Sequence, residues 1–186
     1  MELTDKIENR VFTAEDFETM SFENTLFRNC IFIELKNISF TSCMFKNCNF
    51  SNVNIINSKF QEAEFQDCKL TGTNFSQVNN FGFNVHFYNC LMNMAVFDQV
   101  KFFKSTLSGC QLQEANFTQA DLSKAFIENC DFRDALFSYT NLTNADFRTS
   151  RNFLIDPAQN KLTKAKFKRS DLAGLLYRYD IIITEG

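Results

Sequence analysis

The chain has 186 residues, and its 19 basic and 22 acidic side chains leave a formal net charge of −3. That length suffices for one domain with a substantial core. The near-neutral charge argues against a general nucleic-acid-binding protein and against a disordered acidic chain. No apolar run is long enough to span a membrane, and residues 1–10 lack the apolar segment of a secretory signal. We therefore expect a cytoplasmic protein whose seven cysteines are reduced thiols.

Large apolar residues recur at every fifth position from residue 12 to residue 147, apart from two short slips. All 26 positions of the series are apolar, and they include 18 of the 24 Phe residues of the chain. In chain order the three blocks are Phe12, Phe17, Phe22, Phe27 and Phe32; Phe40, Phe45, Phe50, Ile55, Phe60, Phe65, Leu70 and Phe75; and Phe87, Met92, Phe97, Phe102, Leu107, Leu112, Phe117, Leu122, Ile127, Phe132, Phe137, Leu142 and Phe147. Two residues before each centre of the last block, from Val85 to Ala145, the side chain is small.

A period of five fits neither an α-helix nor a flat strand, whose periods are about 3.6 and 2. It fits a chain that turns one corner per unit, with the large and small residues inside and three polar residues outside. Four units then form one square coil of 20 residues, and coils stacked about 4.8 Å apart hydrogen-bond to each other. We therefore predict an all-β solenoid, a right-handed quadrilateral β-helix.

The cysteines give an independent test of the four-unit coil. Cys48, Cys68, Cys90, Cys110 and Cys130 are spaced by 20, 22, 20 and 20 residues. The spacing of 22 spans the slip between Phe75 and Phe87, so a two-residue bulge near residues 78–82 explains both irregularities. A second slip lies between Phe32 and Phe40. We expect the five cysteines to form one buried column on one face.

The composition offers no catalytic or metal-binding constellation. Buried core thiols explain the cysteines better than metal or redox chemistry, because the chain has no Cys-x-x-Cys pair. The single histidine, His86, lies next to the bulge, and no Gly-rich phosphate loop occurs. We therefore predict no catalytic residues, no metal and no cofactor, and a protein that is not an enzyme.

The C-terminal segment has a different pattern. Ser170 is a suitable N-cap, and Leu172, Leu175, Leu176 and Tyr179 form the apolar stripe of a short helix. Ile181, Ile182 and Ile183 then predict a short strand. The segment either covers the end of the stack or forms a homodimer face, and the two roles are compatible. We predict residues 1–11 as an N-terminal cap, 12–149 as the β-helix and 150–186 as the capping and dimerisation segment.

The repeat over residues 10–149 resembles the pentapeptide-repeat family. The tail is similar to the Qnr and MfpA branch through Asn152, Ile155-Asp-Pro157, Asn160, Ala165 and Phe167, followed by Leu172-x-Gly-Leu-Leu176 and Ile181–Ile183. This resemblance implies a bacterial protein that imitates duplex DNA, binds DNA gyrase or topoisomerase IV, and protects the enzyme from quinolones or peptide toxins. It also implies a dimer through the C-terminal helix and strand. Members of the branch often project two loops from the rod, whereas this chain has only short slips.

The partner-binding residues that we predict are acidic and lie on two adjoining faces of the coil. They are Glu64, Asp67, Glu114, Glu128, Asp131 and Asp134. Such faces would offer a phosphate-like track to a basic DNA-binding groove. The alternative is an ordinary solvated surface on a scaffold or regulatory protein that binds another protein. Under either hypothesis we expect a protein partner, with no direct contact with nucleic acid and none with a membrane.

Overall fold

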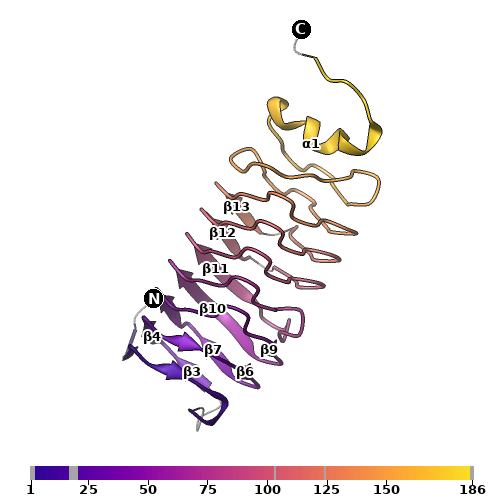
Figure 1. Cartoon of the computed structure of the whole chain (residues 1–186). Coiled ribbons are helices and arrows are strands. Elements are labelled where there is room, and N and C mark those ends of the chain that lie inside the picture. The colour runs from indigo at the N-terminus through magenta and orange to yellow at the C-terminus, as the bar shows by residue number, and fades with distance from the viewer. Residues whose placement is uncertain (1–2, 17–20, 103, 124, 185–186) are drawn as a thin grey trace.

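The computed structural model of the chain describes residues 3–16, 21–102, 104–123 and 125–184. The predictions that concern residues 1–2, Phe17 and residues 185–186 lie outside these ranges. The chain winds into a rod of stacked coils, with the N-terminus at one end and the helix α1 at the other (Figure 1). No helix in the described ranges is long and apolar enough to cross a membrane.

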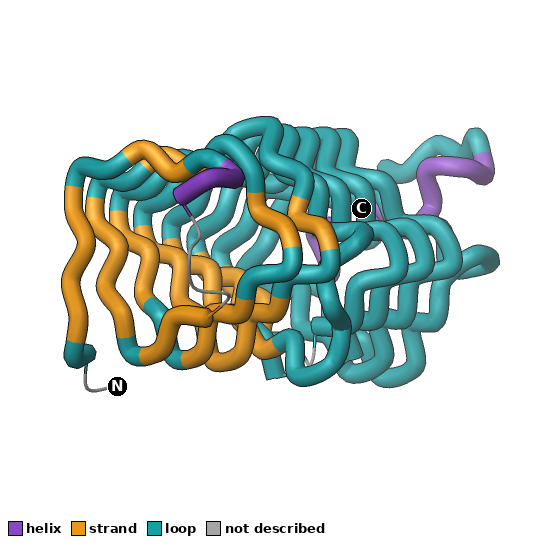
Figure 2. The backbone as a smooth tube through the Cα atoms, turned by 90° about the horizontal axis from the view of Figure 1, so that it is seen from below, coloured by secondary structure: helices purple, strands orange, loops and turns teal. Residues whose placement is uncertain are grey.

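The elements are short because the chain turns a corner every few residues. The strands are β1 (Asp5–Glu8), β2 (Val11–Phe12), β3 (Ser21–Glu23), β4 (Thr25–Arg28), β5 (Ile31–Phe32), β6 (Leu35–Lys36), β7 (Ser39–Thr41), β8 (Met44–Lys46), β9 (Ile55–Ile56), β10 (Lys59–Gln66), β11 (Asn84–Tyr88), β12 (Thr106–Ser108) and β13 (Phe126–Glu128). The helices are η1 (Ala14–Asp16), η2 (Arg169–Asp171), α1 (Ala173–Leu176) and η3 (Tyr177–Tyr179). Figure 2 shows that the strands gather toward the N-terminal part of the rod, and the later coils pair mostly through single bridges.

Every strand pair is parallel, and the usual register joins residues 20 apart, as in Ile7 with Phe27 and Leu107 with Ile127. Twenty residues are four five-residue units, so the predicted four-sided coil is confirmed. One ladder runs from the first coil to β13 in the order β1-β4-β8-β10-β11-β12-β13. Consecutive coils are joined by backbone hydrogen bonds in parallel sheets, so the fold is a β-solenoid.

The core consists of columns of apolar side chains that continue from coil to coil. Phe45 lies between Phe27 and Phe65, with ring centroids 5.0 and 4.7 Å away and nearly parallel planes. Within a coil the rings meet edge to face, as for Phe27 and Phe32 at 5.7 Å. Both arrangements are favourable for aromatic pairs. The five-residue period thus places each core centre directly over the centre of the neighbouring coil, and small residues fill the space between the large side chains.

The cysteine column is confirmed, and it holds one more residue than predicted. All five predicted cysteines are buried, and the amide of Cys48 donates to the Cys68 sulfur at 3.4 Å. Each thiol donates to a carbonyl of the preceding coil, as Cys68 does to Phe45 at 3.2 Å. Cys30 makes the same contact with Ile7 at 3.6 Å and begins the column. The first slip shortens its spacing to 18 residues, which hides it from the 20-residue pattern.

Both register slips are confirmed, and the structure locates them. Leu35 pairs with Ile55 in the ordinary register, whereas Phe22 pairs with Phe40 only 18 residues away, so the first slip removes two residues after Phe32. The second slip is an insertion of two residues, and Phe65 therefore pairs with Phe87.

The second slip separates two neighbouring phenylalanines. Phe83 is buried and extends the core, whereas Phe81 is 88% exposed. The five-residue count assigns neither residue to the core or to the surface.

The coils extend beyond the predicted limits of residues 12 and 149. At the N-terminus, β1 pairs with β4 and forms the outer edge of the sheet. At the C-terminus, Lys166 pairs with Asp146, and Phe167 stacks on Phe147 at 5.5 Å. The segments predicted as caps therefore contribute coils of their own.

The C-terminal end has the predicted helix but not the predicted strand. Ile181, Ile182 and Ile183 form no strand, because no described residue of the chain pairs with them. The prediction that Ser170 caps the helix is wrong. Its hydroxyl donates to Asp171 Oδ1 at 3.0 Å, and α1 begins after Leu172 without a side-chain cap.

Candidate partner-binding surfaces

The corners of the coil place selected side chains outward with a left-handed backbone. The corner residue follows each core centre by two positions, and many corners are Asn, which tolerates positive φ. Asp67, Glu114 and Asp134 occupy such corners, with φ of 54°, 59° and 58°. All three are exposed. Their carboxylates therefore project from the edges of the rod.

The six predicted acidic residues are spread along the rod. Glu114 and Asp134 occupy the same corner on two neighbouring coils. These coils are joined by a hydrogen bond that the Glu114 amide donates to the Arg133 carbonyl at 2.8 Å. Glu64 on β10 and Glu128 on β13 lie on the adjoining face, three strands apart in the order β10-β11-β12-β13. The face assignments agree with the coil, but the structure does not bring these carboxylates into one continuous track.

Asp131 is buried, so its carboxylate is not presented on the surface as the sequence predicts. Its side chain is 7% exposed, forms an ion pair with Arg151 at 3.2 Å, and accepts a hydrogen bond from Asn152 Nδ2 at 2.8 Å. Burial alone would raise the pKa of this carboxyl, but hydrogen bonds from Asn152 and from the Arg133 amide hold it below its usual range. The five-residue pattern places Asp131 outside the core, and it could not show that the next coil covers it.

Basic side chains interrupt the acidic faces. Arg133 is exposed between Asp131 and Asp134, and Arg151 is exposed one coil further along. Glu128 accepts a hydrogen bond from the Ser108 hydroxyl at 3.4 Å. The charge on these faces is therefore mixed, with carboxylates exposed mainly at the corners.

Exposed apolar side chains are frequent in the C-terminal segment, at one end of the rod. The residues predicted for a dimer face are exposed here, apart from Leu175, which packs in part against the core. Ile182 is 92% exposed, and the others with high exposure are Leu172, Leu176, Tyr179, Ile181 and Ile183. A group of this size at one end of a rod is typical of an interaction surface.

Three contacts hold this end segment against the last coils. Gly174 lies so close to Phe153 that a Cβ atom would collide with the Phe153 carbonyl oxygen. The Ile155 amide donates to the Gly174 carbonyl at 3.0 Å. Arg178 forms an ion pair with the buried Asp156 at 3.2 Å. No pattern in the sequence indicates this ion pair.

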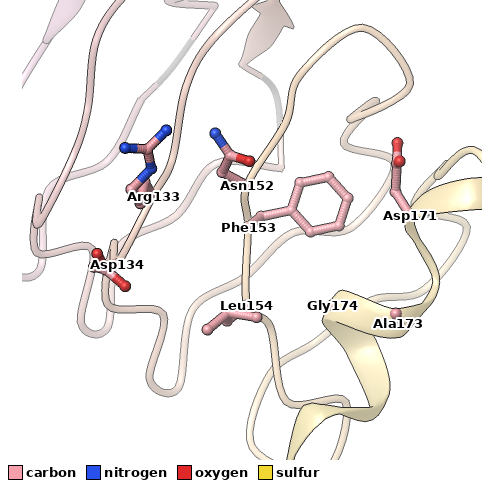
Figure 3. Close-up of a pocket in the computed structure, with 8 residues that line it drawn as sticks. All are labelled: Arg133, Asp134, Asn152, Phe153, Leu154, Asp171, Ala173 and Gly174. Carbon is pink, nitrogen blue, oxygen red and sulfur yellow. The ribbon is translucent and has the colours of Figure 1, made fainter.

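A cavity of about 350 Å³ lies between the last coils and α1. Figure 3 shows its lining: Arg133, Asp134, Asn152, Phe153, Leu154, Asp171, Ala173 and Gly174. The cavity combines charged groups of both signs with the ring of Phe153. Its residues belong to the contact between rod and end segment.

The described residues hold no group of three or more His, Cys, Asp or Glu that could bind a metal ion. Cys43 is a poor nucleophile, because burial raises the pKa of its thiol to about 11. Burial also raises the pKa of the Cys68 and Cys90 thiols. These side chains fill the core and satisfy backbone carbonyls.

Comparison with known proteins identifies the repeat. The family described as pentapeptide repeats matches residues 38–77, 83–119 and 115–151 in eight copies. No curated protein matches the chain. A trypsin-treated form of QnrB1, described as a plasmid-mediated fluoroquinolone resistance protein, has a similar structure with a TM-score of 0.53 and 19% identity over 98% of this chain and 99% of that chain. HetL, a pentapeptide repeat protein of the cyanobacterium Nostoc involved in heterocyst differentiation regulation, matches with a TM-score of 0.24 and 16% identity over 94% and 89%.

Proposed function

The chain belongs to the pentapeptide-repeat family, and from this premise we propose that it is a DNA mimic that binds DNA gyrase or topoisomerase IV. It protects the enzyme from quinolones or peptide toxins and has no catalytic activity of its own. The observation that carries the proposal is the exposed apolar end of a long rod. QnrB1, whose fold is similar along its whole chain, is described as a fluoroquinolone resistance protein.

The rod has a length suited to this role. Six steps of about 4.8 Å separate Ile7 from Ile127 along the main ladder, and two further coils lead to Phe167. Eight steps give roughly 38 Å. Two rods joined at their apolar ends span roughly 75 Å, the length of about 22 base pairs at about 3.4 Å per step.

Homodimerisation through the C-terminal segment is the first part of the proposal. Leu172, Leu176 and Tyr179 are exposed next to Ile181–Ile183. A two-fold contact would remove these side chains from water in both copies. The isoleucines would also gain a backbone partner if the two copies paired there as strands.

The carboxylates at the corners are the second part. Glu114 and Asp134, with Asp67, Glu64 and Glu128 on the adjoining face, are accessible to the basic groove of the enzyme. Asp131 is excluded, because its side chain is 7% exposed and already forms an ion pair with Arg151. Contacts of this kind weaken with salt, since the Debye length falls from about 10 Å at 0.1 M to about 3 Å at 1 M.

The test is a gyrase supercoiling assay with purified protein, with and without a fluoroquinolone. We expect the wild-type protein to inhibit supercoiling or to reduce drug-stabilised cleavage. The double variant Glu114→Lys/Asp134→Lys should lose the effect. A matched control, Glu23→Lys/Glu34→Lys, makes the same change in net charge at two exposed positions outside the proposed surface.

A second function, that of a scaffold for another protein, is favoured by the mixed charge around Arg133. It would replace the first if the wild-type protein neither altered gyrase nor bound it at low salt. Loss of activity in both double variants would show that net charge matters and that the corner does not.

A further inference from the structure

The near-neutral net charge conceals an uneven distribution along the rod. Residues 1–16 contain five acidic and two basic side chains, whereas residues 150–186 contain four acidic and seven basic ones. Five of these seven cations lie within nine residues, at Lys161, Lys164, Lys166, Lys168 and Arg169. We call these five the basic band. No acidic residue occurs between Asp156 and Asp171.

The last coil presents the basic band to solvent. Lys161 pairs with Asn141 and Lys166 with Asp146, so both belong to the coil stack. The side chains between them, such as Leu162, pack against the core, and this alternation points the cations outward. All five members of the basic band are exposed.

Neighbouring carboxylates leave most of this charge uncompensated. Within the described part of the chain, Asp146 is the acidic group that contacts the band, and it lies 3.8 Å from Lys166 Nζ. The same carboxylate is already bound by Arg148, whose Nη2 is 2.7 Å from Oδ2. The hydrogen bond and charge of Arg148 hold the pKa of Asp146 at about 2, so both charges persist at neutral pH. The band with Arg148 is therefore strongly positive.

The composition of the band distinguishes between classes of partner. Lysine is depleted in protein–protein interfaces, whose centres are apolar and aromatic. The large apolar side chains that lie between members of the basic band, Leu162 and Phe167, are at least half buried in the rod and contact its core. Phosphate oxygens of nucleic acids, by contrast, are contacted mainly by Lys and Arg and require no apolar anchor.

We propose that the basic band binds the phosphodiester backbone of nucleic acid, independently of sequence. The rod thus has two unlike surfaces, with carboxylates at its corners and a phosphate-binding coil beside its C-terminal end. If two rods join at that end, the two bands lie near the middle of the dimer. The inference concerns the isolated protein and does not depend on any topoisomerase.

The salt dependence of binding follows from the number of cations. Each phosphate contact with duplex DNA contributes about −0.9 to the slope of log K against log salt. Five contacts give a slope of about −4.5, which is a loss of roughly 500-fold between 50 and 200 mM salt. Removing three cations should change the slope to about −1.8.

The experiment measures fluorescence anisotropy of a labelled 20-base-pair duplex with the full-length protein from 25 to 200 mM salt. The test variant is Lys161→Gln/Lys164→Gln/Lys168→Gln. Glutamine suits these sites, because Gln99 and Gln119 already occupy left-handed corners like that of Lys164. The matched control is Lys36→Gln/Lys59→Gln/Lys69→Gln, which removes three exposed lysines elsewhere on the rod.

We expect binding by the wild type, at least tenfold weaker binding by the test variant at 50 mM salt, and an unchanged slope for the control. A second series with labelled single-stranded DNA of the same length shows whether the protein prefers duplex or single-stranded backbone. Salt-dependent binding to either form supports the proposal. Absence of binding at 25 mM salt, equal losses in both variants, or binding only to anionic lipid vesicles would overturn it. Because no gyrase is present, none of these results bears on the proposed inhibition of gyrase.

Discussion

The column of stacked rings allows a quantitative test of the core. Phe117 is fully buried, and its ring lies between those of Phe97 and Phe137, with centroids 5.2 and 5.3 Å away. Replacing Phe117 by Ala should lower the free energy of unfolding by about 3–5 kcal/mol. The upper part of that range applies, because hydrogen bonds between coils fix the spacing of the stack and prevent the cavity from collapsing. For a chain of this size the melting temperature should fall by roughly 6–20 °C.

Chemical denaturation followed by circular dichroism, at one fixed protein concentration, measures this loss. Two variants serve as controls. Phe126 is 59% exposed, so Phe126→Ala should cost less than about 0.5 kcal/mol. Phe117→Leu should cost less than about 1.5 kcal/mol, because Leu112 and Leu122 fill equivalent core positions. The reasoning fails if Phe117→Ala stays within about 0.5 kcal/mol of the wild type, or if Phe126→Ala is equally destabilising.

Three further predictions concern the ends, the buried charge and a corner. Leu176→Asp would place an unpaired charge in the proposed dimer contact, so this variant should sediment as a monomer and keep the circular-dichroism signal of its β structure. The control Leu91→Asp, on the side of the rod, should remain a dimer. A wild-type monomer at tens of micromolar would contradict this. The lowered pKa of Asp131 stabilises the fold above the ordinary value of about 3.9, and this contribution is lost as the pH falls through the lower, folded-state pKa. Unfolding midpoints from pH 5 to pH 2 should therefore fall less steeply in Asp131→Asn. At Gly109, where φ is +67°, Val should cost about 1–2 kcal/mol and Asn, which occupies the same corner at Asn89, much less.

The repeat was predictable because every unit makes the same contacts. A five-residue period fixes which side chains face inward, and the cysteine spacing fixes four units per coil, so the pattern alone assigns Phe117 and Cys110 to the core. Even the two slips are visible as breaks in that period. Cys30 was missed because it lies before the first slip, where the count no longer matches.

Contacts that occur only once were not predictable. Asp131 has an outward position in its unit, and its burial depends on Arg151 and Asn152 in the following coil. The ion pair of Arg178 with Asp156 and the close approach of Gly174 to Phe153 likewise join segments that share no repeat. For the same reason, the pattern of Ile181–Ile183 indicated a strand without showing which segment could pair with it.

The two ends of the rod differ in a way that limits how copies can assemble. An unpaired strand at the end of a solenoid is a template on which another chain can add, and repeated addition produces a fibre. Here the strand at the N-terminal end, β1, carries Asp5, Lys6 and Glu8, all partly or fully exposed. Two copies that met there in register would bring like charges together and bury them. The opposite end carries α1 and exposed apolar side chains, and if two copies join there, as proposed, neither copy keeps that end free for a third. Assembly of this protein should therefore stop at two copies and not continue into a filament.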